Sequence, residues 1–153
     1  MKLFIIERGY PSKQEPTWGC FEKDQAEALA QLGHQVTILS VDTRFRFYWR
    51  KLVIQCGMQN NIATFNIFLL PYALLFFLPK KMKGWFYAWQ LELIYKYATS
   101  QQGTPDVLYS HYLHTTQKAI RIHKKYNIPL VGIEHWSQMA FLPISRNNLS
   151  TSN

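Results

Sequence analysis

Short apolar runs alternate with stretches of helical periodicity along this chain, beginning at its first residues. Lys2–Glu7 (KLFIIE) is a continuous apolar run, which is typical of a strand buried on both faces of a sheet. The Gly- and Pro-containing stretch 8–19 predicts a loop, and Phe21–Leu32 has apolar residues at helical spacing. Gln35–Val41 (QVTILSV) repeats the strand pattern. Strand, loop, helix and strand in this order predict a βαβ unit with parallel strands and a right-handed crossover.

The last third of the chain repeats this order. After the break at 103–105, Asp106–Ser110 (DVLYS) predicts a strand, Thr115–Tyr126 a helix and Leu130–Glu134 (LVGIE) a second strand. We therefore expect an open α/β sheet of parallel strands flanked by helices, in which the first strand and the strand at 106–110 are neighbours. The expected N-caps of the two helices are Thr17 and either Thr115 or Thr116. At their C-terminal ends we expect Gly33, in a left-handed turn, and Asn127.

The middle of the chain follows neither pattern for long. Ile62–Leu70 predicts a core strand, and Trp85–Tyr97 has helical spacing. The whole apolar stretch 62–78 has 17 residues, near the shortest length for a membrane-spanning helix. Asn66 and Pro71 interrupt it, however, and a span at this place would cut the sheet in half. We therefore favour the core strand, followed by an apolar loop or helix, over the membrane span.

Length and composition indicate one globular domain with a core of its own. The chain has 153 residues, of which 48% are apolar and 17% charged, so wholesale disorder is not expected. We assign residues 1–140 to this domain and 141–153 to a polar, frayed tail. The two cysteines, Cys20 and Cys56, make neither a disulfide framework nor a paired zinc motif. The N-terminus reaches charge and proline too soon for a secretory signal, so the expected location is cytoplasmic.

The balance of charge adds an expectation about partners. The net charge of +8 favours an acidic partner: a nucleic acid, an anionic membrane surface or a phosphorylated small molecule. Because no RNA-binding signature is present, we expect no nucleic acid. Aromatic residues make up 16% of the chain, and several are interleaved with basic residues. These favour peripheral contact with anionic lipid at the inner face of the plasma membrane. The candidate residues for this contact are Arg44, Arg46, Trp49, Arg50, Lys80, Lys81, Lys83 and Trp85.

Candidate site residues follow the predicted strands. In an open parallel sheet, ligands bind beyond the carboxyl ends of the strands, where the strand order reverses. The loop after the first strand, His111 and His135 would then face one crevice. The helix that begins near Trp18 would point its N-terminus at this crevice, where backbone N–H groups favour an anion such as a diphosphate. An imidazole there can donate, accept or transfer a proton near neutral pH.

Each of these residues also has a purely structural explanation. A histidine at a strand end is often satisfied by backbone groups, and Cys20 can be a small buried residue rather than a reactive thiol. His111 with His114, or Glu134 with His135, lacks a third well-spaced ligand, so we expect no metal. The first loop also lacks the G-x-G-x-x-G pattern of a dinucleotide site.

Two parts of the chain resemble a known protein family. The G-x-F-x-x-x-Q-A-x-A-L run at 19–29 and the L-G-H-x-V-T run at 32–37 are typical of the N-terminal domain of GT-B fold glycosyltransferases. PDVLYSHYL at 105–113 and IPLVGIEHWS at 128–137 match a second pattern of that domain. The chain is most similar to glycosyltransferase family 4, which includes bacterial capsule and exopolysaccharide enzymes.

The resemblance implies a function for the chain. It would be the Rossmann-like, acceptor-side domain of a hexosyltransferase of polysaccharide biosynthesis. Such an enzyme moves a sugar from a nucleotide-sugar to a glycan or lipid-linked acceptor with retention of configuration, and needs no cofactor besides the nucleotide-sugar co-substrate. Gly19 and Cys20 would face the donor diphosphate, and His111 the transferred sugar. The acceptor rim would carry Glu134, His135 and Ser137.

The chain departs from this family at two points. Gly19-Cys20 stands where many members have a Gly-Gly pair, and no second domain with an E-x7-E pair follows Ser137. We therefore expect the isolated chain to be inactive, as an excised domain or a truncated frame would be, and to expose an apolar docking surface that favours self-association. Two alternatives remain open: a non-catalytic binding module or partner subunit of this fold, and a small-molecule enzyme complete in one domain.

Overall fold

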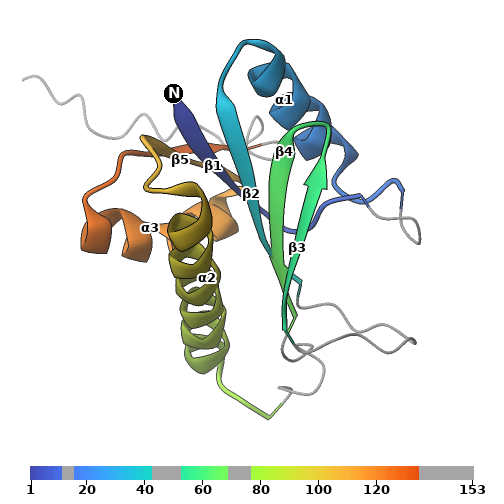
Figure 1. The fold of residues 1–153 in the computed structure, drawn as a ribbon. Helices are drawn as coiled ribbons and strands as arrows, with labels where there is room; N and C mark the ends of the chain where they lie inside the picture. The colour runs from blue at the N-terminus through green and yellow to red at the C-terminus, as the bar shows by residue number, and fades with distance from the viewer. Residues whose placement is uncertain (12–15, 43–52, 69–76, 135–153) are drawn as a thin grey trace, which may run out of the picture.

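A computed structural model describes residues 1–11, 16–42, 53–68 and 77–134 of the chain. Within these residues, six strands form one sheet with three helices packed against it (Figure 1). The strands are β1 (Lys2–Glu7), β2 (Gln35–Val41), β3 (Ile54–Gln59), β4 (Ile62–Ile67), β5 (Val107–His111) and β6 (Leu130–Ile133). The helices are α1 (Cys20–Gln31), α2 (Lys80–Gln102) and α3 (Leu113–Tyr126).

The described strands are mostly parallel. Their order is β3-β4-β2-β1-β5-β6, and of these β3 alone runs antiparallel to its neighbour. β1 lies between β2 and β5, which confirms the predicted neighbours and the open α/β sheet. The chain passes from β1 to β2 on one side and later enters β5 on the other, so the strand order reverses at β1.

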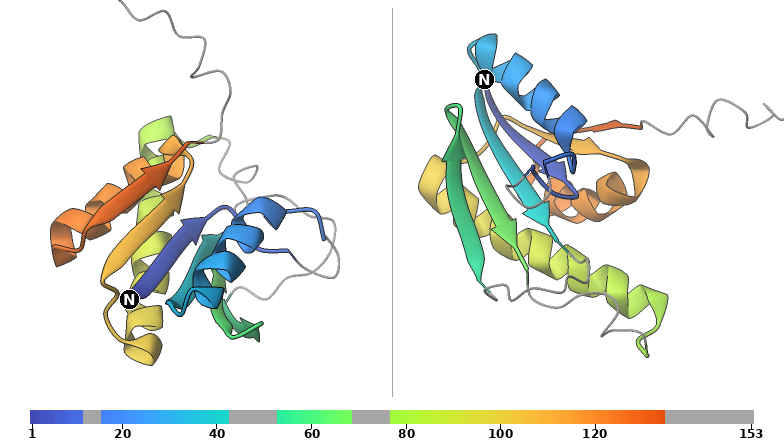
Figure 2. Two further views of the ribbon diagram at one scale, coloured as in Figure 1. Left: turned by 90° about the horizontal axis from the view of Figure 1, so that it is seen from above. Right: turned by 90° about the vertical axis from the view of Figure 1, so that its right-hand side faces the viewer.

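The helices lie on both faces of the sheet (Figure 2). α1 covers one face, while α2 and α3 pack side by side on the other. Alternate residues of β1 face the two layers: Phe4 and Ile6 pack with side chains of α2 and α3, and Ile5 packs with Ala26 of α1. These three strand residues have no exposed surface. Burial on both faces explains why β1 is a continuous apolar run.

Both predicted threonine caps are wrong. The N-cap of α1 is Gly19, and Thr17 lies two residues before it. The N-cap of α3 is Tyr112, so Thr115 and Thr116 lie inside the helix. The Thr116 hydroxyl donates back to the Tyr112 carbonyl at 3.0 Å, which is a bond within the first turn of α3 and not a cap. At the other ends, Gly33 and Asn127 do follow the helices with φ angles of 84° and 53°.

The middle of the chain contains a hairpin that the sequence patterns do not predict. β3 pairs with β4 through a turn at Asn60 and Asn61, whose φ angles are 49° and 63°. β4 ends at Ile67, short of the predicted Leu70, and α2 extends five residues beyond the predicted helix at each end. Residues 62–67 of the stretch considered as a membrane span thus form a strand. None of the described helices combines the length and apolarity that crossing a membrane requires.

Candidate functional site

Three strands end side by side where the strand order reverses. Ile6 of β1 pairs with Ser110 of β5, and His111 of β5 pairs with Ile133 of β6. The segments after these strands therefore leave the sheet at one edge, next to the loop that leads into α1. We call the side chains gathered there the switch-point cluster, which consists of Arg8, Trp18, His111, Tyr112, His114 and Glu134.

A cation held between aromatic rings forms the centre of the switch-point cluster. The guanidinium carbon of Arg8 lies 3.8 Å from the centre of the Tyr112 ring and 5.3 Å from that of Trp18. Tyr112 in turn stacks on His114, with ring centroids 5.9 Å apart and 27° between the planes. Arg8 Nε is buried and has no hydrogen-bond partner in the described part of the chain. A guanidinium between rings keeps its charge and its planar N–H donors, so this arrangement suits an anionic or hydroxyl-rich ligand.

Glu134, predicted to lie on the acceptor rim, caps helix α3. The Leu113 N–H donates to Glu134 Oε2 at 2.6 Å, and the Tyr112 N–H donates to the Ile133 carbonyl at 2.7 Å. The carboxylate thus satisfies a donor at the helix N-terminus, where the helix dipole favours negative charge. Tyr112 has a φ of 69°, which is uncommon for a residue with a side chain. These two bonds hold this backbone turn, and with it the Tyr112 ring over Arg8.

The two histidines of the switch-point cluster differ in their exposure to solvent. His111, the predicted catalytic residue, has no exposed surface, and its ring packs edge-on against Tyr109 with centroids 5.1 Å apart. His114 is exposed. Partial burial of its ring, followed by the positive charges of Lys118 and Arg8, lowers the pKa of His114 below its usual value of 6.5. His114 is therefore a neutral imidazole at neutral pH that can accept a proton from a ligand.

A buried carboxyl lies between the end of β1 and the first turn of α1. Glu7 has no exposed surface, and neither of its oxygens has a hydrogen-bond partner among the described residues. Burial raises the pKa of Glu7 well above its ordinary value, and the nearby Glu22 carboxylate raises it further. The site therefore favours the protonated, neutral form of Glu7, because a charge there would lie unpaired and out of water.

Gly19 lies where the first loop meets α1. Its φ is 75°, and a Cβ at this position would lie 2.1 Å from the Gly9 carbonyl oxygen. The missing side chain therefore makes room for the backbone of the same loop. Cys20, also predicted to face the diphosphate, is the first residue of α1 and is half-buried. Because Trp18 belongs to the switch-point cluster, the N-terminus of α1 lies beside that cluster.

Comparisons with known proteins bear on the fold of this chain. No family model and no curated protein matches the sequence. Among solved structures, the chain is similar to OtsA in its apo form, at 12% identity and a TM-score of 0.57 over 88% of this chain and 33% of that one. It is also similar to sucrose-phosphate synthase from Thermosynechococcus elongatus, at 11% identity and a TM-score of 0.52 over 99% of this chain and 37% of that one. A third similar structure is that of E. coli trehalose-6-phosphate bound with UDP-2-fluoro glucose, at 14% identity and a TM-score of 0.50 over 86% of this chain and 32% of that one.

All three of these structures are GT-B glycosyltransferases. The chain has the fold of a GT-B Rossmann-like domain. At identities of 11–14% the likeness concerns the fold, and the capsule-type assignment stays a prediction. The chain spans about a third of the length of the structures it matches.

The GT-B-like domain does not bring all predicted site residues together. Gly19, His111 and Glu134 lie at one edge of the sheet. The predicted lipid-contact residues that the structure describes lie instead in the first two turns of α2; they are Lys80, Lys81, Lys83 and Trp85. Six further predicted residues lie outside the described parts of the chain: Arg44, Arg46, Trp49, Arg50, His135 and Ser137. Within the described ranges, no three His, Cys, Asp or Glu side chains gather closely enough to hold a metal ion.

The centre of the site was not predicted. Arg8 and Tyr112 form the cation–ring contact, and neither was among the predicted site residues. His114 was considered only as a metal ligand. A simple signal was present, because Arg8 directly follows the first strand and Tyr112 directly follows His111. The rule for ligand sites in parallel sheets, applied to the residue after each strand, would have found both.

Proposed function

We propose that this chain is the acceptor-side domain of a retaining glycosyltransferase, which moves a sugar from a nucleotide-sugar to a glycan acceptor. The observation that carries the proposal is the position of the switch-point cluster at the ligand-binding edge of a GT-B-like domain. One structure of this fold is bound with UDP-2-fluoro glucose, and another is a sucrose-phosphate synthase. The motifs at 19–37 and 105–137 support the same function.

The residues of the site divide between donor and acceptor in this proposal. The N-terminus of α1, with Gly19 and Cys20, takes the donor diphosphate, because free N–H groups at a helix N-terminus favour an anion. The Arg8 guanidinium donates hydrogen bonds to the acceptor from between its two rings. His114 is exposed and neutral, so it is the imidazole that can take a proton from an acceptor hydroxyl.

The remaining predicted residues keep narrower roles. His111 is assigned to the transferred sugar, and its burial means that neighbouring side chains must move before a ligand touches it. Glu134 belongs to the acceptor rim through its cap on α3, together with His135 and Ser137. The sugar is added to a polysaccharide, as in the capsule enzymes that the motifs resemble, and the acceptor is a glycan, either free or lipid-linked.

We expect the chain of 153 residues to bind ligands without transferring sugar. It spans about a third of the length of the GT-B structures it matches, and the family it resembles uses a second domain for the nucleotide-sugar. A binding module of the same fold is the second candidate, since the catalytic candidate His111 is fully buried.

Saturation-transfer NMR on the 153-residue chain, with a panel of nucleotide-sugars and glycans, tests the proposal. We expect binding of at least one glycan, weakened by about tenfold or more in Arg8→Ala, because a charge-assisted hydrogen bond is lost. Arg121→Ala is the matched control, since Arg121 pairs with Glu92 of α2 and is not part of the switch-point cluster. Binding of no member of the panel would contradict the proposal. Sugar transfer by the chain alone would contradict its expected inactivity.

A further inference from the structure

The side of α2 that faces away from the sheet carries apolar residues that are not part of the buried core. Met82, Trp85, Phe86, Trp89 and Leu93 recur at helical spacing, so they share one face of α2. We call this face the α2 stripe. The opposite face of the same helix supplies the buried residues that pack against the sheet, namely Tyr87, Leu91, Ile94, Tyr95 and Ala98.

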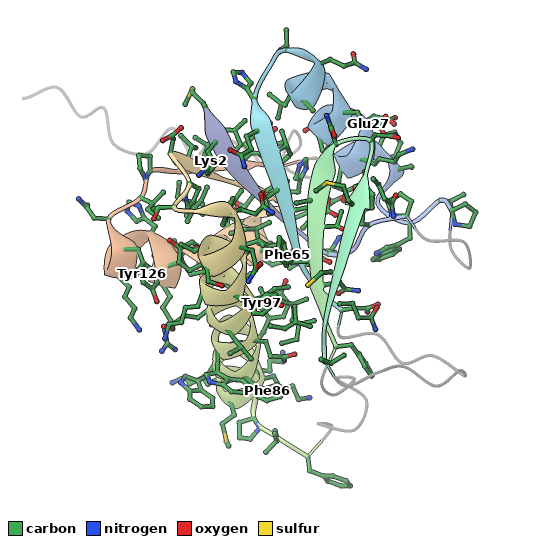
Figure 3. All side chains as sticks on the ribbon, in the orientation of Figure 1. Lys2, Glu27, Phe65, Phe86, Tyr97 and Tyr126 are labelled. Atoms are coloured by element: carbon green, nitrogen blue, oxygen red, sulfur yellow. The ribbon has the colours of Figure 1, made fainter. Side chains whose placement is uncertain are left out.

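The α2 stripe is exposed along its length. Trp85 is 60% exposed, Met82 51%, and Trp89 and Leu93 39% each. Phe86, labelled in Figure 3, stacks on Trp89 with ring centroids 5.7 Å apart. The first turns of α2 extend past the ends of β2 and β4 (Figure 2). Large apolar side chains grouped in this way on one exposed face mark an interaction surface.

Positive charge accompanies the α2 stripe. Lys80, Lys81 and Lys83 lie in the first turn of α2, which contains no acidic residue. Cations at a helix N-terminus oppose the helix dipole, so these lysines cost helix stability. The first carboxylate along the helix, Glu92, is bound by cations of α3. Lysines that disfavour their own helix and border exposed rings point to an anionic partner.

We propose that the α2 stripe docks on an anionic lipid surface, with α2 lying in the plane of the interface. Trp rings favour the headgroup level of a bilayer, because they are apolar while their N–H stays near water. Lysines at the border of such a face reach anionic headgroups with their long side chains. The composition of the α2 stripe, with rings on the exposed face and lysines at its border, is that of an interfacial helix.

The charges disfavour a second copy of the chain as the occupant. Lys81 lies at the N-terminal border of the α2 stripe, and Lys96, which pairs with Glu92, lies on the stripe's face at its other end. A two-fold contact between two such stripes brings lysine opposite lysine, whether the helices run parallel or antiparallel. Like charges facing each other across an interface are unfavourable. Anionic headgroups, by contrast, neutralise both ends.

The position of the α2 stripe relates it to the candidate site. α2 runs against the direction of the parallel strands, and its C-terminal end lies beside the start of β1, since a Cβ on Gly103 would lie 2.6 Å from Lys2 Nζ. Its N-terminal turns therefore lie toward the edge at which the switch-point cluster forms. Docking would bring that edge close to the headgroups. The inference rests on α2 alone and does not require the proposed function.

Co-sedimentation of the 153-residue chain with vesicles tests the charge requirement. One set of vesicles contains phosphatidylcholine alone, and the other contains phosphatidylcholine mixed with phosphatidylglycerol. We expect partitioning into the anionic vesicles only. In the triple variant Lys80→Gln, Lys81→Gln, Lys83→Gln, partitioning should fall on the order of 100-fold. The control variant Lys2→Gln, Lys23→Gln, Lys124→Gln loses the same net charge elsewhere and should partition almost as well as the unchanged chain.

A second pair of variants tests the rings. Trp85→Ser with Trp89→Ser should abolish partitioning and the blue shift of tryptophan fluorescence on adding anionic vesicles. Phe21→Ser with Leu32→Ser removes two exposed apolar residues, one in the first turn of α1 and one at its C-cap, and should leave both the partitioning and the blue shift unchanged. All four positions are exposed, so circular dichroism should show the same helix content in every variant.

Three outcomes would overturn the proposal. The first is equal partitioning into neutral and anionic vesicles. The second is an equal loss in the lysine variant and its control, which would show that net charge and not the α2 stripe drives binding. The third is a dimer in sedimentation velocity that the Trp85→Ser, Trp89→Ser variant dissolves, with no vesicle binding, because a second copy would then cover the α2 stripe.

Discussion

The carboxylate of Glu134 reaches from the end of β6 to the first turn of α3. It accepts the Leu113 N–H at 2.6 Å, and this bond holds the turn in which Tyr112 has a φ of 69°. That turn places the Tyr112 ring 3.8 Å from the Arg8 guanidinium. Glu134 thus positions the centre of the candidate site through the backbone.

Replacing Glu134 tests this cap. Glu134→Ala should lower the free energy of unfolding by about 1 kcal/mol, because α3 loses a hydrogen-bond acceptor at its N-terminus. Glu134→Gln keeps an acceptor oxygen and loses only the charge at the helix dipole, so its loss should be smaller. Denaturant unfolding measures both values, and hydrogen exchange of the Leu113 amide reports the cap directly. An unchanged exchange rate in Glu134→Ala would show that no cap forms in solution.

At the scale of residues, the sequence predicted the place of the site better than its contacts. The rule for parallel sheets predicted that the first loop, His111 and His135 face one crevice. In the structure the first loop and His111 lie at one edge of the sheet, and His135 lies outside the described residues. The rule did not predict that Arg8 stacks on Tyr112, because these residues are 104 positions apart and their contact depends on packing. The positive φ of Tyr112 could not be predicted either, since that turn contains no Gly or Asn, the residues that usually indicate a positive φ.

At the scale of elements, the buried strands were predictable and the exposed edge was not. β1 and β2 are buried along most of their length, so their apolar runs identify them. β3 has five exposed residues of six (IQCGMQ), and its one clue was the Asn60-Asn61 pair in the turn. The predicted helix begins at Trp85, five residues after the true start of α2 at Lys80. Three lysines in a first turn are unfavourable for a helix N-terminus, so the sequence does not indicate this start.

Two glycines that flank α1 allow a prediction at this scale. Gly19 and Gly33 both have positive φ, but a Cβ at Gly19 would lie 2.1 Å from the Gly9 carbonyl oxygen, whereas a Cβ at Gly33 has nothing within 4 Å. Gly33→Ala should therefore cost only about 1–2 kcal/mol of conformational strain. Gly19→Ala should cost roughly 2 kcal/mol more, since the loop and α1 must also separate. Equal losses in thermal or denaturant unfolding would show that the loop yields without cost.

At the scale of the whole molecule, two glutamates should give the stability opposite dependences on pH. Burial raises the pKa of Glu7 in the folded chain, so its carboxyl favours folding most below its ordinary value of 4.5 and loses that contribution as the pH rises. The Lys125 ammonium, which donates a hydrogen bond to Glu92, is the main cause of the lowered pKa of that carboxyl. Glu92 therefore stabilises the fold above 4.5 and loses that contribution on acidification.

The variants Glu7→Gln and Glu92→Gln separate these two contributions. Glu7→Gln should gain stability relative to the unchanged chain as the pH rises from 4.5 toward neutral, by about 1.4 kcal/mol per pH unit until the folded pKa is reached. Glu92→Gln should lose stability over the same range, because the ion pairs that link α2 to α3 are present only when Glu92 is charged. The free energy of unfolding, measured in denaturant at several pH values, gives both slopes. If Glu7→Gln follows the unchanged chain at every pH, the Glu7 carboxyl is solvated in the folded protein, and β1 and α1 are not closed over it.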